Sequence, residues 1–486
     1  MTELHELTML GQSAAIRDRT ISPVELVEHY LARIDSLDPQ VGAFVTVTAD
    51  SARAAAREAE ERIRRADPDD LPPLHGVPTC FKDLTATAGV RTMFGSKVLA
   101  GNVPTFDADV VTLLRRAGTI SLGKTATSEF GILLSCETGQ GPPTRNPWSP
   151  GLIAGGSSGG AAAAVAAGLA PAAQGSDGGG SLRVPASLCG LVAMKPTRGV
   201  VSHGPLHSGM FGLPTNGPLG RTVADVAALL DAMAVPMPGE PHLPPPPPPE
   251  GSFLAALRRG GRLRIGRHAR PLVAETGVDP EVLRVWEETS KLLASLGHEV
   301  IDIAPPFDPS VGPLFDQIFG VLAANPLSPQ RERQLHPLTR FVRERASAQS
   351  AWAVLGTLGQ LQNAARSAMR SLSGVDLVLT PVLARVSAPM GYFTEPDDPA
   401  DQLERQRQFS PFCSPYNLTG QPAMSLPLGW SHDGLPIGVM LAGRPGADAT
   451  VLAVAAQLEA ERPWKDRHPP LWRQADISSE TAVHSD

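Results

Sequence analysis

Apolar residues near the start of the chain recur at the three- and four-residue spacing of an amphipathic helix. They are Leu26, Val27, Tyr30, Leu31 and Ile34. Ser22 can cap the start of this helix, with Pro23 at its first position and Glu25 completing a capping box. We therefore predict that a helix begins directly after Ser22.

Short apolar runs alternate with further helical patterns along the rest of the chain. The expected helices lie at 49–65, 110–117, 224–233 and 280–296. The expected strands lie at 119–123, 262–267, 298–303, 376–380, 423–428 and 437–441, with another entered between 74 and 84. Strands that alternate with helices form parallel sheets covered by helices. The pattern therefore predicts an α/β fold.

The composition supports a large folded core. The 486 residues are 42% hydrophobic and 19% charged, which excludes a wholly disordered chain and a coiled coil. Six consecutive prolines stand in the proline-rich stretch 236–250. We interpret this stretch as a polyproline spacer in a surface loop, in preference to a site for an SH3-like partner. The polar tail, 476–486, is expected to be disordered.

Charge and cysteine content narrow the function classes. The formal net charge is −7 and the pI is near 6.0, which leaves no electrostatic footprint for nucleic acid. The amino terminus has no signal-peptide pattern, and the most apolar stretch, 161–173, is too short to cross a bilayer. The four cysteines are widely spaced and indicate neither a zinc site nor a disulfide framework. We expect a cytoplasmic protein without membrane association.

Two short patterns match known motifs without the structural context that each motif requires. Residues 118–125 fit the phosphate-binding loop template, but a helix is expected to end at Gly118 and the next residues alternate like a strand. Residues 155–159 fit the G-x-S-x-G elbow of α/β-hydrolases, but 146–151 resemble a turn-rich loop where that elbow needs a buried strand. No histidine stands in an informative context for a Ser–His–Asp triad. We therefore expect neither ATP binding nor a nucleophile elbow.

Glycine is concentrated in one region, with ten glycines between 155 and 190. Ser157 and Ser181 lie there among glycines, whose backbone can turn N–H groups toward a substrate oxygen without a Cβ in the way. Lys82 lies in an apolar run, so we expect burial to lower its pKa and to provide a neutral amine as a base. Together these residues predict a serine that attacks a carbonyl carbon.

With these blocks the sequence resembles the amidase signature family over nearly the whole chain, from Leu4 to Trp472. The blocks that carry the resemblance are 76–83, 155–160 and 175–185, with supporting matches at 145–148, 195–199 and 417–423. The resemblance implies a single domain over 1–475. It also implies one large mixed, mostly parallel β-sheet core that helices cover on both faces.

The resemblance further implies roles for individual residues. Ser181 matches the nucleophile, Ser157 the bridging serine that follows a cis peptide bond in the family, and Lys82 the general base. The oxyanion hole matches the backbone N–H groups of Gly178, Gly179, Gly180 and Ser181. The positions that support this loop match Asp177, Arg183 and Ser158. Many members of the family have a larger residue where Gly178 stands.

The implied activity is hydrolysis of a small-molecule carboxylic amide through a serine acyl-enzyme, without a metal ion or cofactor. Aryl and aliphatic amides, carbamates and esters are all candidate substrates, and a homodimer is an assembly state that the resemblance allows. The alternative is the glutamine-hydrolysing A subunit of a tRNA-dependent amidotransferase complex. In that branch an aspartate precedes the N-L-x-G-x-P motif, whereas 409–416 contain no acidic residue here. We therefore favour the stand-alone amidase.

The substrate pocket is expected from segments that vary within the family. We predict contributions from 128–134, 209–213 and 305–352. The apolar candidates in the last segment are Phe307, Phe315, Ile318, Phe319, Phe341 and Trp352. Ordinary helix core is the alternative for each of them, as a buried apolar role is for Cys80 and Cys413. An apolar pocket would favour aryl or aliphatic amides over charged ones, and a lysine base would give an alkaline pH optimum.

Overall fold

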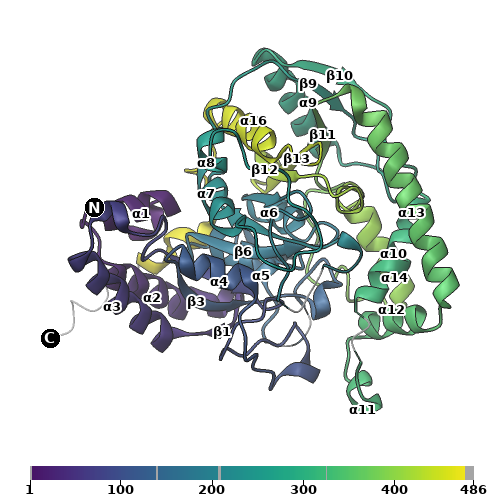
Figure 1. Cartoon of the computed structure of the whole chain (residues 1–486). Helices are drawn as coiled ribbons and strands as arrows, with labels where there is room; N and C mark the ends of the chain where they lie inside the picture. The colour runs from purple at the N-terminus through teal and green to yellow at the C-terminus, as the bar shows by residue number, and fades with distance from the viewer. Residues whose placement is uncertain (1–2, 138, 140, 206–208, 324–325, 477–486) are drawn as a thin grey trace.

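Figure 1 shows the computed structural model of the chain, which describes residues 3–137, 139, 141–205, 209–323 and 326–476. The strands are β1 (Phe44–Val47), β2 (Pro78–Lys82), β3 (Ile120–Thr125), β4 (Arg145–Asn146), β5 (Ser149–Ile153), β6 (Ala172–Asp177), β7 (Val192–Lys195), β8 (Thr215–Gly220), β9 (Arg264–Arg267), β10 (Glu299–Asp302), β11 (Leu377–Pro381), β12 (Ala423–Trp430) and β13 (Pro436–Gly443). All except β4 and β5 form one 11-stranded sheet in the order β1-β3-β2-β6-β8-β7-β12-β13-β11-β9-β10. The predicted disordered tail lies outside the described residues from residue 477 onward.

The helices largely follow the predicted pattern. They are α1 (Met9–Arg17), α2 (Pro23–Val41), α3 (Ala49–Arg65), α4 (Asp109–Arg116), α5 (Gly159–Ala166), α6 (Arg183–Cys189), α7 (Val223–Met233), α8 (Phe253–Ala256), α9 (Pro280–Ser295), α10 (Val311–Leu322), α11 (Pro329–Glu332), α12 (Pro337–Ser347), α13 (Ala351–Ser371), α14 (Pro399–Phe409), α15 (Pro415–Leu418) and α16 (Asp448–Glu461). The capping box of α2 is present, because Ser22 accepts from the Glu25 N–H and the Glu25 carboxylate accepts from the Ser22 N–H. The first predicted helix is therefore confirmed.

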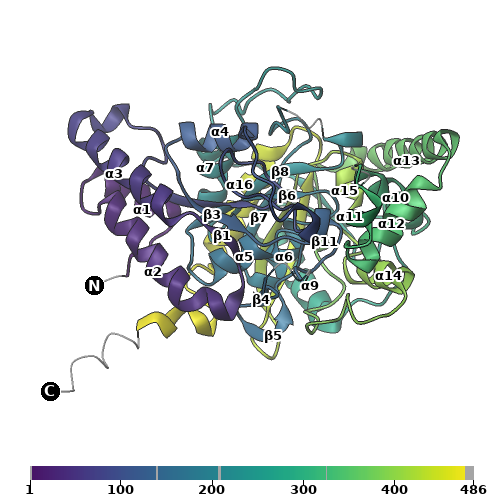
Figure 2. The ribbon, with the colours of Figure 1, turned by 90° about the horizontal axis from the view of Figure 1, so that it is seen from below.

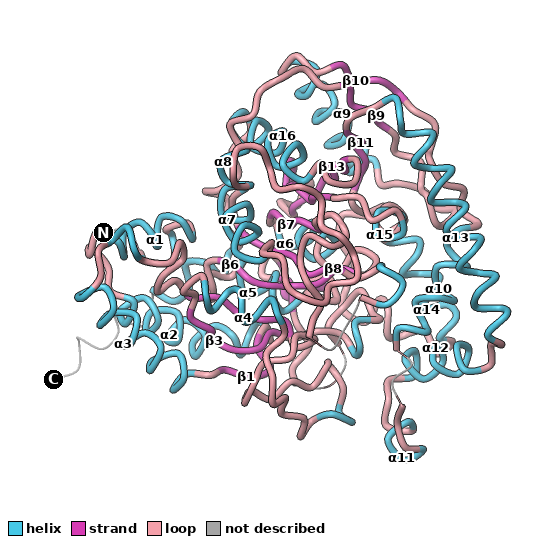
Figure 3. The backbone as a smooth tube through the Cα atoms, in the orientation of Figure 1, coloured by secondary structure: helices cyan, strands magenta, loops and turns pink. Residues whose placement is uncertain are grey.

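Helices cover the sheet on both sides. α7, α8 and α16 pack against one another, with α7 on β8 and α16 on β12 and β13. α5 and α6 pack together, with α5 on β6 and α6 on β12 and β13. Figure 2 shows α7 and α16 on one side of the strands and α5 and α6 on the other, and Figure 3 shows the strands running through the centre of the molecule. The large mixed sheet and its helices confirm the predicted α/β fold.

The prediction of a mostly parallel sheet is wrong. In the described part of the chain, β2 pairs in parallel with β3 and β6, and β9 with β10 and β11. The other neighbouring strands of the large sheet are antiparallel. The short loop between β12 and β13 can join only antiparallel strands, and β8 runs antiparallel to both β6 and β7. Parallel pairing is therefore confined to strands toward the two ends of the sheet.

Neither of the two rejected motifs has its required structural context, but one of the reasons given for rejection needs correction. Residues 120–125 form β3 as predicted, so no helix N-terminus follows the phosphate-loop pattern. The segment before Gly155 is not a plain loop, because β4 and β5 form a small antiparallel hairpin there. Most residues of β5 are half-buried or exposed, and the hairpin is separate from the large sheet. The buried strand that a nucleophile elbow requires is therefore absent before Gly155. The prediction of a loop at 146–151 is wrong, because these residues belong to the hairpin.

The proline-rich stretch forms a surface loop without helix or strand, as predicted. His242, Pro245 and Pro248 are half-buried while most of their neighbours are exposed, which follows the three-residue repeat of a polyproline helix. Pro245 packs beside Gly446. Within the described residues, we find no helix whose length and apolar character would suit it to crossing a membrane.

Candidate active site

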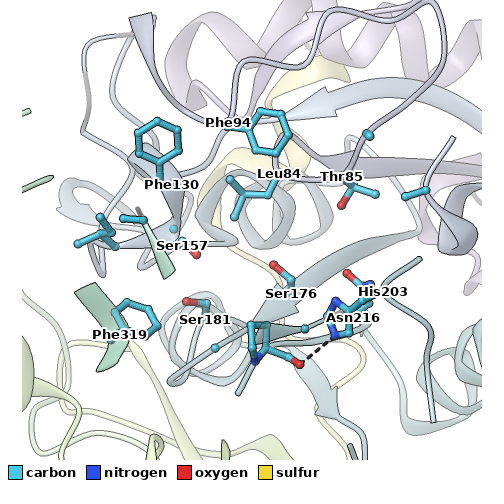
Figure 4. Close-up of a pocket in the computed structure, with 18 of the residues that line it drawn as sticks. Leu84, Thr85, Phe94, Phe130, Ser157, Ser176, Ser181, His203, Asn216 and Phe319 are labelled. Carbon is cyan, nitrogen blue, oxygen red and sulfur yellow. Dashed lines mark hydrogen bonds between the residues drawn. The ribbon is translucent and has the colours of Figure 1, made fainter. Parts of the chain in front are cut away.

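The glycine-rich blocks meet at a cavity of ≈350 Å³. Figure 4 shows Ser157, Ser176 and Ser181 facing the same space. The aromatic side chains that line the cavity are Phe94, Phe106, Phe130 and Phe319. Its further polar lining residues include Thr85, His203 and Asn216. None of the described lining residues is an aspartate, glutamate, lysine or arginine, so the wall suits an uncharged ligand.

Lys82, at the end of β2, is fully buried. Its Nζ lies 2.7 Å from Ser157 Oγ, 3.1 Å from Ser176 Oγ and 3.2 Å from the Ser176 carbonyl oxygen. The carbonyl oxygen can only accept a hydrogen bond, so an Nζ–H is donated to it. A neutral amine has two N–H groups and one lone pair, which match these three neighbours if the Ser157 hydroxyl donates to the lone pair.

Burial lowers the pKa of Lys82 from its usual value of 10.5 to about 7, against smaller opposing effects of Cys136 and Asp177. The cause is the loss of water around the ammonium group, which disfavours the charged form. A substantial neutral fraction therefore exists near pH 7. This agrees with the expectation from the apolar run around Lys82.

Ser157 and its neighbour Ser158 have different roles in the structure. The peptide bond between Gly156 and Ser157 is cis, and Ser157 lines the cavity. The Ser158 hydroxyl donates to the Ser176 carbonyl oxygen at 3.0 Å, and the Ser158 N–H donates to the Ser181 carbonyl oxygen at 3.2 Å. Ser158 thus ties together the two glycine–serine blocks, which fits the supporting position that the resemblance implies.

The loop from Gly178 to Ser181 brings backbone N–H groups to the cavity. The Gly180 N–H is already donated to Asp177 Oδ1 at 2.7 Å, so we leave Gly180 out of the proposed oxyanion hole. We find no acceptor among the described residues for the N–H groups of Gly178, Gly179 and Ser181. Gly178 and Ser181 also line the cavity. Three N–H groups therefore remain to bind a substrate oxygen.

A buried ion pair holds this loop in place. Arg183 Nε and Nη2 each donate to the Asp177 carboxylate at 2.9 Å, and both side chains are fully buried. Asn417 Nδ2 donates to the same carboxylate at 2.9 Å, while Asn417 Oδ1 accepts from Arg183 Nη2 at 2.7 Å. Burial alone would raise the pKa of Asp177, but Arg183 and Asn417 hold it well below its usual range. The carboxylate in turn accepts from the Gly180 and Leu182 N–H groups.

We expect Asp177→Asn to lower the free energy of unfolding by about 3–5 kcal/mol, because it leaves the Arg183 guanidinium buried without its counter-charge. Urea denaturation measures the change. Asp302→Asn is the matched control, since Asp302 pairs with Arg267 at 2.8 Å while its side chain is 79% exposed. That variant should be close to the unmodified protein. Equal effects of the two substitutions would contradict the anchoring role of Asp177.

Two phenylalanine–glycine pairs shape one wall of the cavity. Phe94 and Phe130 have φ values of 54° and 50°, and the glycine after each also has a positive φ. Bulky residues rarely adopt this left-handed conformation, and such strain is concentrated at functional sites. The Phe130 N–H donates to the Phe94 carbonyl oxygen at 2.9 Å, which joins the two pairs. Figure 4 shows both rings on the same side of the cavity.

The opposite wall depends on the missing side chain at Gly178. A Cβ at Gly178 would lie 3.2 Å from Phe319 Cε2, so a larger residue would press on this ring. Phe319 stacks on Phe315, with ring centroids 5.6 Å apart and planes at 20°. Phe315 in turn lies against Gly179. The two rings of α10 thus cover the glycine loop. A larger residue at position 178 would hinder this packing.

Only part of the predicted pocket lines this cavity. Residues 130–132 confirm the segment 128–134, and Gly209 confirms the segment 209–213. Of the candidates in 305–352, Phe319 is in the lining. The remaining candidates lie elsewhere: Phe307, Phe315 and Ile318 are buried, Phe341 is half-buried and Trp352 is 85% exposed. Cys80 and Cys413 are buried and outside the described lining, so the apolar alternative holds for them.

Sequence reasoning missed several residues of the cavity. They are Thr85, Phe94, Phe106, Ser176, His203 and Asn216. Ser176 lies inside the block 175–185 but was given no role there, whereas the others come from loops and a strand end that no local pattern groups. His203 is held by a 2.9 Å hydrogen bond between its Nε2 and the Pro214 carbonyl oxygen. For Phe94 a signal was available, because the Phe94–Gly95 pair repeats the Phe130–Gly131 pair of a predicted segment.

One group of described residues could offer atoms to a metal ion. Glu3, His5 and His29 bring their donor atoms within 4.8 Å of one another. His5 Nδ1 and His29 Nε2 are already hydrogen-bonded at 3.0 Å. Burial, reinforced by the charge of Arg33, lowers the pKa of His5 to about 3. His5 is therefore neutral near pH 7, and we interpret its hydrogen bond to His29 as a contact within the amino-terminal segment.

Comparison with known proteins gives consistent matches. The family model described as Amidase matches residues 25–452. The chain is 38% identical to the putative amidase AmiB2 of Mycobacterium tuberculosis (strain ATCC 25618 / H37Rv), covering 97% of this chain and 99% of the relative. It is 35% identical to an acylamidase of Rhodococcus erythropolis, covering 96% and 98%. It is also 36% identical to the A subunit of the glutamyl-tRNA(Gln) amidotransferase of Chloroflexus aggregans, covering 97% and 100%.

Two solved structures extend the comparison to the fold. The structure of 6-aminohexanoate cyclic dimer hydrolase has a TM-score of 0.89 and 32% identity, covering 97% of this chain and 100% of the other. A bacterial aryl acylamidase of the amidase signature family has a TM-score of 0.84 and 25% identity, covering 95% and 98%.

Proposed function

The chain belongs to the amidase family and is an amide C–N hydrolase, and we propose that it cleaves small uncharged amides through an acyl-enzyme on Ser181. One observation carries the proposal. The buried amine of Lys82 lies 2.7 Å from the hydroxyl of Ser157, and Ser157 and Ser181 line the same cavity. The arrangement supports a Ser–Ser–Lys triad in which a neutral lysine is the base.

The proposed reaction begins with proton transfer. Neutral Lys82 accepts a proton from Ser157, which takes one from Ser181 as Ser181 Oγ attacks the amide carbonyl carbon. The developing oxyanion accepts hydrogen bonds from the N–H groups of Gly178, Gly179 and Ser181. The proton then returns through Ser157 to the leaving nitrogen, and the C–N bond breaks. Water, deprotonated along the same path, releases a carboxylic acid and restores Ser181.

The cavity wall supports uncharged substrates. Four phenylalanine side chains line it, and its described lining contains no acid, lysine or arginine. Burial of a charged substrate group against such a wall would cost free energy without a compensating partner. We therefore propose aryl or aliphatic amides as the preferred class, with uncharged carbamates and esters as related substrates.

A substrate panel tests this function. It contains an anilide, an aliphatic amide, a carbamate, an ester, 6-aminohexanoate cyclic dimer and glutamine, each assayed for kcat/KM. We expect the uncharged amides to be hydrolysed fastest, and a preparation with Ser181→Ala controls for contaminating activity. A panel in which charged primary amides gave the highest kcat/KM would overturn the proposal.

The alternative is the glutamine-hydrolysing component of an amidotransferase complex, a function named for one relative at 36% identity. Sequence identity alone does not separate the two branches, since the amidases match at 35–38%. Glutamine, however, carries an ammonium and a carboxylate, and the described cavity wall offers neither an acid nor a lysine or arginine to bind them. Glutaminase activity that rises when candidate partner proteins are added would favour this alternative.

We expect kcat/KM to fall about tenfold per pH unit below pH 7 and to level off above it. The reason is the pKa of Lys82, which burial lowers to about 7. Below this pKa the ammonium form dominates and cannot accept a proton, whereas above it the amine is free to do so. A rate profile from pH 5 to 10 with an uncharged amide measures the effect. A flat profile between pH 5 and 9 would contradict a lysine base.

The remaining expectations about context also stay proposals. The four cysteines are free and buried, which supports the proposed reducing, cytoplasmic setting. We propose no nucleic-acid or membrane partner, and a homodimer remains an assembly state to be tested by light scattering.

A further inference from the structure

A second cavity of ≈300 Å³ lies beside the first, among α10, α13, α15 and the segment 209–213. The two cavities share walls. On α10, Ile318 lines the second cavity and the next residue, Phe319, lines the first. In the segment 209–213, Gly209 lines the first cavity, whereas Phe211 and Leu213 line the second. Figures 1 and 2 both show α10 and α13 side by side at this end of the molecule.

The second cavity differs from the first in charge. Most of its wall is apolar and comes from Phe211, Leu213, Ile318, Leu358, Leu361 and Met369. Two arginines, Arg198 and Arg366, also line it, and its described lining contains no aspartate or glutamate. An apolar chamber with two guanidinium groups and no acid suits a ligand that has an apolar body and an anionic end.

Arg198 is a half-buried cation without a carboxylate partner among the described residues. Its Nε donates to the Gly212 carbonyl oxygen at 2.6 Å, and its Nη2 donates to the carbonyl oxygens of Asn417 and Leu418 at 2.9 Å. Burial lowers the pKa of Arg198, with no acid acting to raise it. Carbonyl oxygens orient the guanidinium but leave its charge uncompensated, so a bound anion would stabilise it.

Arg366 reaches the cavity from α13, on a different element from Arg198. Its side chain is exposed, and we find no carboxylate paired with it in the described parts of the chain. Nη1 of Arg198 makes no hydrogen bond within the described residues, so it can donate to one oxygen of a bound carboxylate group. The exposed Arg366, which lines the same cavity from α13, can donate to the other oxygen.

We propose that this second cavity binds a monocarboxylate with an apolar body, its carboxylate facing Arg198 and Arg366 and its body against the leucine and isoleucine side chains. The acid released by amide hydrolysis is a ligand of this class, a link that rests on the proposed function. The binding itself does not depend on turnover. The inference therefore stands or falls separately from the assignment of Ser181 as nucleophile.

Isothermal titration of the full-length protein with 4-phenylbutyrate tests the site. We expect saturable binding, with 4-phenylbutanol, which lacks the charge, at least about tenfold weaker. Arg366→Gln should weaken 4-phenylbutyrate binding at least about fivefold, because it removes a charge-assisted hydrogen bond. Arg370→Gln, on the same helix but outside the described lining, removes the same charge and should change the affinity less than twofold. Arg198 is a poor test, because its loss would also free the loops that it joins.

Two matched substitutions, each of which fills one cavity with a larger side chain, test where the ligand binds. Ala365 lines the second cavity and Ala108 lines the first. We expect Ala365→Phe to abolish measurable binding and Ala108→Phe to leave it unchanged. The reverse result would place the acid in the first cavity and overturn the proposal. So would equal effects of Arg366→Gln and Arg370→Gln, or no saturation at 10 mM. Failure of the amidase assignment would instead appear in the substrate panel and leave these titrations unaffected.

Discussion

Ser181→Ala is expected to lower kcat by roughly 10⁴- to 10⁶-fold, the effect seen when a serine hydrolase loses its nucleophile. The substitution removes a single hydroxyl group. The cavity, the Asp177–Arg183 pair and the N–H groups of the loop should remain, because the Asp177–Arg183–Asn417 hydrogen bonds that position the loop do not involve that hydroxyl. We therefore expect substrate affinity to change little while turnover is lost. Steady-state kinetics and equilibrium binding with one uncharged amide measure the two quantities separately.

Ser135→Ala is the matched control for this prediction. Ser135 is also a buried serine close to the glycine-rich block, and its hydroxyl has no hydrogen-bond partner in the described structure. Its loss should therefore leave kcat nearly unchanged. Mass spectrometry of the unmodified protein, quenched during turnover of an ester, should place the acyl group on Ser181. If Ser181→Ala stayed active and His203→Ala did not, a histidine-dependent hydrolase would replace the proposed triad.

The parts of the fold that the sequence predicts are those that local physics determines. The start of α2 and both ends of α3 were predicted correctly, because capping residues and a repeating face act within one helix. β6, β7 and β8 were not predicted. The glycine, proline and polar residues of β6 and β8 do not form a strand pattern, and β7 has only four residues. They are strands because neighbouring strands and helices bury them. The same strands make the centre of the sheet antiparallel.

In the candidate site, too, features set by the local sequence could be predicted and features set by tertiary contacts could not. Lys82, Ser157 and Ser181 could be proposed from the sequence, because the glycine-rich or apolar residues around each of them are its neighbours in the chain. The hydrogen bond from the Gly180 N–H to Asp177 could not be predicted, because it depends on the path of the loop in space. Phe94 and His203 were also missed, since they approach the cavity from segments more than 100 residues apart. The proposed roles of these residues come from the family resemblance, whereas the residues that line the cavity are known only from the structure.

Lys82→Met is expected to lower kcat/KM by roughly 10²- to 10⁴-fold, the contribution of a positioned general base. Methionine has nearly the same length but no group that can accept a proton from Ser157. The remaining rate should also lose its dependence on a group with a pKa of about 7, because that titration belongs to Lys82. A pH–rate profile of the variant from pH 5 to 10 measures both effects.

Lys195→Met is the matched control, because Lys195 is equally buried and its pKa is likewise lowered to about 7, chiefly by burial and then by Arg183. Its Nζ donates to the Pro196 carbonyl oxygen at 2.9 Å, and it lies outside the described cavity lining. We expect this variant to retain most of the activity and the pH profile. Comparable losses in the two variants would mean that a buried lysine matters for the fold alone.

The pH dependence of stability is expected to be the same for both lysines, so it controls for effects of burial alone. A lysine with a pKa of about 7 when folded and 10.5 when unfolded binds more protons in the unfolded state between these values. The contribution of each lysine to the free energy of unfolding therefore rises with pH across that interval. The same contribution is lost as the pH falls back to 7. Either methionine variant should show a flatter increase of the free energy of unfolding from pH 7 to 10.5. The two substitutions should thus act alike on stability, and only Lys82→Met should abolish the pH-dependent rate, because only Lys82 lies beside Ser157.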